Sequence, residues 1–390
     1  MEVRKGYKQT EVGMIPEDWD VASLGGVCRM KSGEGITSAD IDEFSKYPCY
    51  GGNGLRGFTN RFTHDGQYAL IGRQGALCGN VVGAEGKFFA SEHAVVVTPF
   101  EQTDIHWLTY VLGDMRLNQY SESSAQPGLS VSKLLKLNIA FPSNKTEQRA
   151  IAAAVSDVDS LLTALDALIA KKCLIKQGTM QELLTGRKRL LGFTAKWEVK
   201  KIGEITRTTA GGTPSTLIDS YWGGEIKWMS SGELHLKRVY DVEGRITEEG
   251  LKNSSTSIIP PKCVLIGLAG QGKTRGTVAM NMVELCTNQS IAAILPSSAF
   301  IPEYLYFNFD SRYDELRSIS TGDGGRGGLN LTLINKMVVP LPPLPEQTAI
   351  AEILSDMDAE IAALETHREK TSLLKQGMMQ ELLTGKTRLV

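Results

Sequence analysis

Apolar residues recur at alternating spacings of four and three in two long stretches of the chain. They are Ile151, Val155, Val158, Leu162, Leu165 and Ile169 in the first stretch, and Ile350, Leu354, Met357, Ile361 and Leu364 in the second. This spacing is typical of a helix that packs along a heptad seam. Roughly 38 residues at 1.5 Å each predict helices about 55 Å long. An ordinary bundle core would show the same seam, but two copies of equal length favour an antiparallel pair of spacer helices.

The two stretches are copies of one sequence. Residues 147–190 align with residues 346–389 without gaps, and 24 of the 44 aligned positions are identical. A weaker similarity pairs residues 18–27 with residues 196–205. The chain is therefore predicted to be an internal duplication of a variable region followed by a helix. We place the four parts at residues 1–145, 146–190, 191–345 and 346–390.

Short apolar runs separated by Gly, Asn and Ser predict strands in both variable regions. These runs cover residues 68–72, 93–97, 264–268 and 290–295. Helices are predicted around residues 105–118 and 302–317. The predicted fold class is α/β (mixed α+β), with two globular domains separated by two long antiparallel coiled-coil helices and a pseudo-twofold internal repeat.

Composition narrows the class of protein. The chain has 390 residues, enough for more than one core, and no stretch is long and apolar enough to span a bilayer. No secretory signal is visible at the start, so we expect a cytoplasmic protein. The six cysteines are scattered, which predicts reduced and mostly buried thiols. Residues 1–145 carry 14 basic and 16 acidic side chains and residues 191–345 carry 16 and 15, so bulk electrostatic binding of nucleic acid is not favoured.

Residues 267–274, GLAGQGKT, match the phosphate-binding pattern G-x-x-x-x-G-K-T. That chemistry needs a helix beginning at Lys273, but the following RGTVAM favours a strand. The aligned loop of the first region, YALIGRQGALCG, has no Lys-Thr pair. A variable loop between two strands fits both copies. A nucleotide-dependent enzyme built on Lys273 and Thr274 remains the rival hypothesis.

Other catalytic patterns are weaker. Asp219 with Glu225 and Lys227 resembles a carboxylate-plus-lysine nuclease pattern, but Glu-x-Lys recurs elsewhere in the chain. No two of the five histidines lie at metal-ligand spacing. We therefore expect no catalytic residue and no metal site in this chain.

Three kinds of segment carry a resemblance to a known family: YKQTEVGMIPEDWDV (7–21), PLPPLPEQTAIAEILSDMD (340–358) and both KQGxMQELLTG segments. With them, essentially the whole chain resembles the specificity (S) subunits of type I restriction-modification systems. The resemblance implies that residues 1–145 and 191–345 are target recognition domains, each reading one half of a bipartite, asymmetric site in double-stranded DNA. The helices would set the spacing and dock methyltransferase (M) subunits, expected to be two, and restriction (R) subunits.

The resemblance further implies a subunit that is not catalytic alone and binds no cofactor itself, since S-adenosylmethionine, ATP and Mg belong to the partner subunits. The entry to the first helix, FPSNKTEQ, departs from the fuller PLPPLPEQ of the second, so its docking details are less defined. A coiled-coil adaptor without DNA contact is a third hypothesis. The duplication of whole α/β regions favours DNA reading over scaffolding.

Candidate DNA contacts are loop residues that can reach phosphates or base edges. They are Lys31, Ser32, Asn53, Arg56, Arg73 and Gln74 in the first domain, and Thr213, Trp228, Ser230, Lys273, Arg275 and Arg326 in the second.

Overall fold

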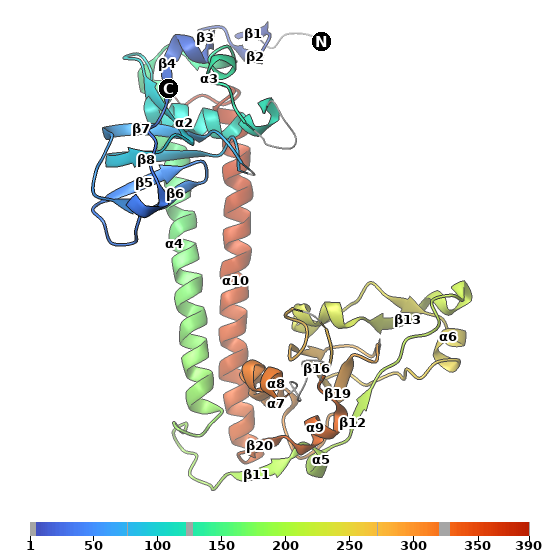
Figure 1. The fold of residues 1–390 in the computed structure, drawn as a ribbon. Coiled ribbons are helices and arrows are strands. Elements are labelled where there is room, and N and C mark those ends of the chain that lie inside the picture. The colour runs from blue at the N-terminus through green and yellow to red at the C-terminus, as the bar shows by residue number, and fades with distance from the viewer. Residues whose placement is uncertain (1–4, 76, 122–127, 271, 320–327, 390) are drawn as a thin grey trace. The chain divides into compact units, whose positions relative to one another are not determined.

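A computed structural model describes residues 5–75, 77–121, 128–270, 272–319 and 328–389 (Figure 1). The chain forms two compact units. Unit 1 comprises residues 1–166 and 366–390, and unit 2 comprises residues 167–365. Each unit therefore combines one variable region with part of both long helices.

Within the residues that the structure describes, unit 1 contains ten strands and five short helices, and most of the strands form one sheet. Its strands are β1 (Tyr7–Thr10), β2 (Gly13–Pro16), β3 (Trp19–Ser23), β4 (Cys28–Ser32), β5 (Tyr47–Gly51), β6 (Gly54–Thr59), β7 (His64–Gly72), β8 (Val81–Ala90), β9 (Ala94–Pro99) and β10 (Asn138–Pro142). Its short helices are α1 (Leu24–Val27), η1 (Ser38–Asp40), α2 (Ile105–Asp114), η2 (Leu117–Tyr120) and α3 (Val131–Leu134). Six strands form one sheet in the order β4-β9-β7-β8-β5-β6, and β3 pairs with β10 separately.

The main core of unit 1 joins the sheet to the helices. Strands β7 and β9 alternate between two faces, as the pleat requires. One face packs against α2 and against the buried residues Ile151 and Val155 of the long helix, together with Leu382 near the end of the other long helix. The opposite face forms a smaller cluster around Phe88. The apolar seam at the start of the long helix therefore belongs to the core of a domain as well as to a helix pair.

Unit 2 repeats this plan with shorter strands. Its strands are β11 (Glu198–Lys201), β12 (Thr208–Ala210), β13 (Trp222–Met229), β14 (Arg238–Val239), β15 (Arg245–Ile246), β16 (Val264–Gly267), β17 (Val278–Asn281), β18 (Cys286–Thr287), β19 (Ile291–Ile294) and β20 (Val338–Leu341). Its short helices are α5 (Ile202–Ile205), η3 (Asp219–Tyr221), η4 (Ser231–Leu236), α6 (Glu248–Lys252), α7 (Pro302–Asp310), α8 (Tyr313–Ser318) and α9 (Leu331–Lys336). The strand orders are β12-β19-β16-β17-β14 and β15-β13-β18, and β11 pairs with β20 as β3 pairs with β10.

The two long helices are α4 (Lys145–Leu183) and α10 (Leu344–Leu382). Within unit 1, Asp159 and Asp166 of α4 pair with Lys375 (2.6 Å) and Arg368 (2.7 Å) of α10. Within unit 2, Lys172 of α4 pairs with Glu360 of α10 (2.6 Å). Residues later in α4 meet residues earlier in α10, so the helices are antiparallel. The predicted mixed fold with an internal repeat and two long antiparallel helices is confirmed.

The seam residues face inward. Ile151, Val155, Leu165, Ile350 and Leu354 are at most 6% exposed. The other predicted positions, Val158, Leu162, Ile169, Met357, Ile361 and Leu364, are half-buried.

The predicted strands all exist, and the two helices predicted within the variable regions are shorter than their patterns. The helix predicted over residues 105–118 ends at Asp114, and the one predicted over residues 302–317 is divided between α7 and α8. All six cysteines are free, and only Cys173 among them is exposed. In the described residues, no helix has both the length and the apolar character needed to cross a bilayer.

Candidate functional site: reading loops and helix clasps

Four separate segments of unit 1 meet at the loop that follows β7. The Arg73 guanidinium donates to Ser32 Oγ at 3.1 Å, and the Arg73 amide donates to the His93 carbonyl at 2.9 Å. Gly52 lies next to Gln74, because a Cβ atom added to Gly52 would be 3.0 Å from the Gln74 carbonyl oxygen. We call this group, residues 32, 52–53, 73–74 and 92–93, the first reading edge. It brings together four of the six residues predicted in this domain.

The other two predicted residues lie beside this edge in different ways. The Arg56 side chain packs over Gly51, at the hairpin turn that exposes Asn53. Lys31 is exposed but precedes Ser32 on β4, so its side chain points to the opposite face of the sheet. Lys31 and Ser32 therefore cannot contact the same DNA surface through this strand alone.

Sequence reasoning missed Glu92 and His93 of the first reading edge. His93 Nε2 lies 3.3 Å from Glu92 Oε1, and both residues are half-exposed. They directly precede the apolar run that forms β9. The sequence signal that could have identified them is a pair of polar residues directly before an apolar run.

Unit 2 builds a second reading edge from residues 212–213, 228–230 and 288–290. The Trp228 indole donates to the Gly212 carbonyl at 2.9 Å, which places Thr213 beside Gln289, to whose side-chain oxygen it donates. The Asn288 amide donates to the Met229 carbonyl at 3.0 Å, next to Ser230. Gln289 was not among the predicted residues. Ser230 also caps η4, where its amide donates to Glu233 at 2.8 Å, so it has a structural role whatever else it contacts.

The two reading edges share one backbone frame. The Leu268 amide donates to the Ser290 carbonyl at 2.8 Å, as the Arg73 amide does to His93. The Leu329 amide then donates to the Leu268 carbonyl at 3.0 Å, and the Leu129 amide donates to the Arg73 carbonyl at the same distance. Leu268 is thus the counterpart of Arg73. By the same alignment, Gln289 is the counterpart of Glu92, so equivalent positions carry different chemistry.

The remaining predicted residues of the second domain fall on or near the β16–β17 hairpin. Lys273 is exposed and Arg275 is half-buried. The Tyr313 hydroxyl of α8 donates to the Lys273 carbonyl at 3.2 Å, which ties the hairpin loop to α8. Arg326 lies outside the described residues.

The structure does not support the phosphate-binding interpretation of GLAGQGKT. The Gly267 amide donates to the Thr277 carbonyl at 3.0 Å, and the Gly276 amide donates back to Gly267 at 2.9 Å. These bonds close a β-hairpin, so the chain after Lys273 enters β17 rather than the helix whose N-terminus would bind phosphates.

The nuclease-like pattern and the possible metal ligands can be compared with their surroundings in the structure. Lys227 pairs with Asp241 at 3.3 Å, so the lysine of the nuclease-like pattern is engaged in an ion pair outside that pattern. Of the residues the structure describes, no three His, Cys, Asp or Glu side chains are grouped to hold a metal ion.

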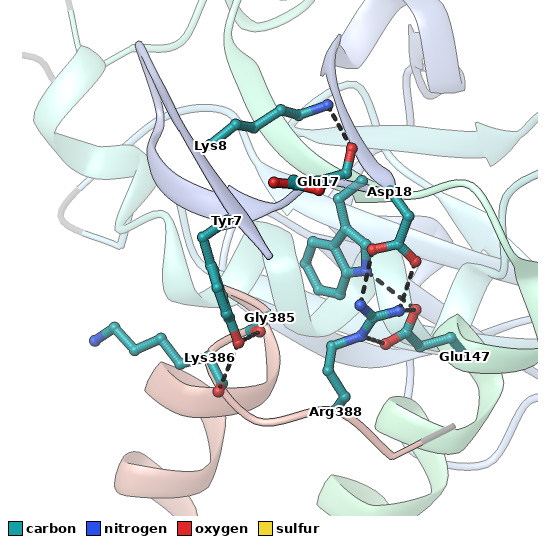
Figure 2. A network of polar contacts seen from close by, with 9 residues as sticks. Tyr7, Lys8, Glu17, Asp18, Glu147, Gly385, Lys386 and Arg388 are labelled. Carbon is teal, nitrogen blue, oxygen red and sulfur yellow. Dashed lines mark hydrogen bonds and ion pairs between the residues drawn. The ribbon is translucent and has the colours of Figure 1, made fainter. Parts of the chain in front are cut away.

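A second set of polar contacts holds the ends of the long helices; we call each set a clasp. In the first clasp, Glu147 in the first turn of α4 is 1% exposed and accepts from the Trp19 indole at 3.0 Å (Figure 2). Arg388, just beyond α10, donates to Glu147 at 2.9 Å and forms two bonds of 2.8 Å with Asp18. The Tyr7 hydroxyl donates to the Gly385 and Lys386 carbonyls, both at 3.1 Å. The start and the end of the chain are therefore bound to each other.

The electrostatics of the first clasp follow from this geometry. The hydrogen bonds from Arg388 hold the pKa of Asp18 below its usual value of 3.8. In return, the hydrogen bonds to Asp18 and then Glu147 raise the pKa of Arg388. A buried carboxylate needs such paired donors, because leaving it unpaired in the core would be costly.

The second clasp repeats the first in unit 2. Glu346 accepts from the Trp197 indole at 3.0 Å and from Arg189 at 2.6 and 2.7 Å. Arg189 also donates to the Ala195 carbonyl at 3.0 Å. Trp197, Glu346 and Arg189 are the repeat counterparts of Trp19, Glu147 and Arg388.

A Gln follows each clasp Glu and bonds the neighbouring backbone. Gln148 donates to the Pro142 carbonyl at 2.8 Å and accepts from the Asp104 amide at 2.7 Å. Gln347 does the same with the Pro342 carbonyl (2.8 Å) and the Ile301 amide (2.9 Å). The buried Glu-Gln pair thus fixes each variable region to the first turn of a long helix.

Comparisons with known proteins agree with this duplicated architecture. A profile of the family "Type I restriction modification DNA specificity domain" matches residues 16–172 and 194–374. The chain belongs to this family. The two matched segments each cover one variable region and most of the helix that follows, so the family's domain occurs twice.

Relatives and solved structures of the family are similar over different lengths. The EcoprrI specificity subunit of Escherichia coli is 45% identical over 37% of this chain, and the MjaIX specificity subunit of Methanocaldococcus jannaschii is 34% identical over 42%. These alignments span only 36% and 38% of the two relatives. The crystal structure of the type I restriction-modification S subunit from M. genitalium has a TM-score of 0.69 at 17% identity, with 98% of each chain covered. Another type I restriction-modification structure has a TM-score of 0.57 at 15% identity, over 96% of this chain and 99% of that chain. At these identities the structures show a shared fold.

Proposed function

We propose that the chain is the DNA sequence-specificity subunit of a type I restriction-modification complex. Each recognition domain would read one half of a bipartite site in double-stranded DNA. The observation that carries this proposal is the shared frame of the two reading edges, in which Arg73 and Glu92 are replaced by Leu268 and Gln289. Because Arg pairs best with guanine and Gln with adenine in the major groove, two such edges favour an asymmetric site.

Methylation mapping tests this proposal and separates the two halves. The full chain is produced with its M subunit in a host, and methylated positions are compared with those made by the M subunit alone. We expect a split motif that requires this chain. Arg73→Ala should relax or abolish only one half of the motif, and Gln289→Ala only the other, so each variant is the control for the other. An unsplit motif, or the same change from both variants, would contradict the proposal.

Partner docking is a second part of the proposal. Leu373 and Leu374 of α10 are 62% and 59% exposed, and their repeat counterparts Leu174 and Ile175 of α4 are 69% and 44% exposed. In unit 1 these leucines border a mainly apolar surface groove of about 810 Å³. Exposed apolar positions that recur in both copies of the repeat favour one kind of partner bound twice. We therefore propose that two M subunits dock on these faces and that R subunits join the assembly.

Native mass spectrometry of the complex tests the docking faces. Leu373→Glu and Leu174→Glu should each reduce the assembly from two M subunits to one, and the double variant should bind none. Leu161→Glu is the matched control, because Leu161 is 44% exposed and its repeat counterpart is already Glu360. If both single variants retained two M subunits, the faces would not be docking sites.

We further propose that the chain is not catalytic alone and acts in the cytoplasm, where its DNA substrate lies. S-adenosylmethionine, ATP and Mg would bind to the partner subunits. Calorimetry on the isolated chain should then detect no binding of S-adenosylmethionine or ATP, and binding of ATP abolished by Lys273→Ala would instead support the nucleotide-dependent hypothesis.

A further inference from the structure

A large apolar side chain protrudes from the second recognition domain on a fixed loop. Leu217, between β12 and β13, is 92% exposed. Two indole groups hold the backbone that carries it: Trp228 donates to the Gly212 carbonyl at 2.9 Å, and Trp222 donates to the Ser215 carbonyl at 3.1 Å. The two rings pack edge to face with centroids 5.1 Å apart. Leu217 therefore lies on a loop whose backbone is held at two points.

The first recognition domain presents Phe44 in a similar way. Phe44, between β4 and β5, is also 92% exposed. The Asp42 carboxylate accepts from the amides of Phe44 (2.8 Å) and Ser45 (2.6 Å) and from the Ser45 hydroxyl (2.6 Å). This side-chain-to-backbone turn fixes the local conformation. The hydrogen bonds, that from the Ser45 hydroxyl first, lower the pKa of Asp42, so the turn is formed by the carboxylate.

The two loops occupy the same place in the duplicated fold. Strands β4 and β12, which precede the loops, pair antiparallel with β9 and β19. Strands β5 and β13, which follow them, pair in parallel with β8 and β18. The loops share no sequence motif, yet each carries one apolar side chain that is 92% exposed. In unit 2 the same loop also carries Thr213 of the second reading edge.

Single exposed apolar residues are common on protein surfaces and need no explanation. Here the equivalent loop of both domains carries one apolar side chain that is 92% exposed, and hydrogen bonds hold the backbone of each loop. The sequence neighbours of the two exposed residues are mostly polar: Ser215 and Thr216 precede Leu217, and Glu43 and Ser45 flank Phe44. Ile218, 40% exposed, is the one apolar neighbour of Leu217. A protein partner needs a contiguous apolar area, whereas a base step accepts a single inserted side chain.

We propose that Leu217 and Phe44 are wedges, each inserting between two adjacent base pairs of its half-site when the recognition domain binds DNA. The inference rests on the proposed function, because it requires a DNA-reading chain. Each wedge unstacks one base step and kinks the duplex, which makes the affinity of each domain depend on how easily that step deforms. The wedges thereby add sequence selectivity at positions that the reading edges do not contact.

The test uses the full chain in complex with its methyltransferase partner and duplexes that carry its site. 2-Aminopurine replaces one base at a time, outside the adenines that are methylated, and its fluorescence reports local unstacking. With the wild-type chain we expect increased fluorescence at one step in each half-site. Leu217→Ala should remove the signal in one half and Phe44→Ala in the other, each with about a tenfold loss of affinity for the specific site. Leu217→Met and Phe44→Leu should retain both signals.

Leu191→Ala is the matched control, since Leu191 is fully exposed but lies in the linker after α4. It should change neither fluorescence nor affinity. Unchanged fluorescence in Leu217→Ala and Phe44→Ala would overturn the proposal, and so would a loss of methyltransferase binding with DNA distortion intact, which would make these residues protein contacts. Failure of the proposed function is seen separately, because the wild-type complex would then show no site-specific binding.

Discussion

Both clasps consist of a Glu, an Arg and a Trp side chain, but the Arg and Trp are close in the sequence in unit 2 and far apart in unit 1. In unit 2, Arg189 and Trp197 are linked by a short covalent segment, so the chain itself keeps them near Glu346. In unit 1, Arg388 and Trp19 lie at opposite ends of the sequence and meet only through noncovalent contacts at Glu147. The first clasp has contacts that the second lacks, from Asp18 and Tyr7. The comparison indicates that these extra contacts replace a peptide connection.

The largest expected effect comes from removing the buried carboxylates. Glu147→Ala and Glu346→Ala should each lower the free energy of unfolding of their own unit by about 3 kcal/mol, because each removes a buried carboxylate that accepts from an Arg and a Trp. Hydrogen exchange followed by mass spectrometry can assign the loss to one unit. Equal loss of protection in both units from either variant would show that the clasps do not act separately.

Replacing the clasp arginines should reveal the difference between the two connections. Arg388→Gln removes the bonds to both Asp18 and Glu147, and we expect a loss of about 2 kcal/mol with faster exchange in β1 and β2. Arg189→Gln should leave those strands unaffected, since Arg189 belongs to the clasp of unit 2 and is joined to Trp197 by a short covalent segment. The comparison fails if Arg388→Gln leaves exchange in β1 and β2 unchanged.

Tyr7→Phe removes one hydroxyl group that bridges two carbonyls at the end of α10. We expect a loss of about 1 kcal/mol, in the range of an ordinary hydrogen bond. Exchange of the amides in residues 385–389 is the measurement. A loss that persists when Arg388→Gln is already present would show that Tyr7 acts independently of Arg388.

The smallest effect should come from Asp18, whose side chain is 65% exposed. Asp18→Asn should cost about 0.5 kcal/mol, as for other exposed ion pairs. Because the pKa of Asp18 is lowered in the folded chain, its contribution is present above the unfolded value of 3.8 and is lost as pH falls through the lower folded pKa. The difference between wild type and variant should thus disappear in acid. Lys196→Asp, at the counterpart of Asp18, should stabilise unit 2 by a similar amount.

The reading edges extend the comparison from stability to recognition. Their backbone frame is the same, yet Arg73 and Leu268 differ in charge and length at one equivalent position. Leu268 is 7% exposed and belongs to the core of unit 2, so the position that carries a polar side chain in unit 1 carries a core residue in unit 2. Four of the six residues predicted in the first domain gather at its edge, whereas Glu92 and His93 were missed.

The sequence by itself determined the duplication, the long antiparallel helices and the mixed fold. These features follow from periodicity and from a repeat of 44 positions, both of which are visible in the order of residues alone. The hairpin that excludes a phosphate-binding helix after Lys273 was foreseen from the strand-forming residues that follow.

Only the tertiary structure decided how distant residues combine. Nothing in the spacing of Trp19, Glu147 and Arg388 indicates a clasp, because the contact joins side chains 128 and 241 positions apart. Likewise, Phe44 and Leu217 are exposed on loops whose backbone is held by Asp42 and by two tryptophans, and a sequence pattern cannot distinguish an exposed apolar residue from one in a core. Burial and long-range pairing are properties of the folded chain, since they arise when separate segments exclude water together.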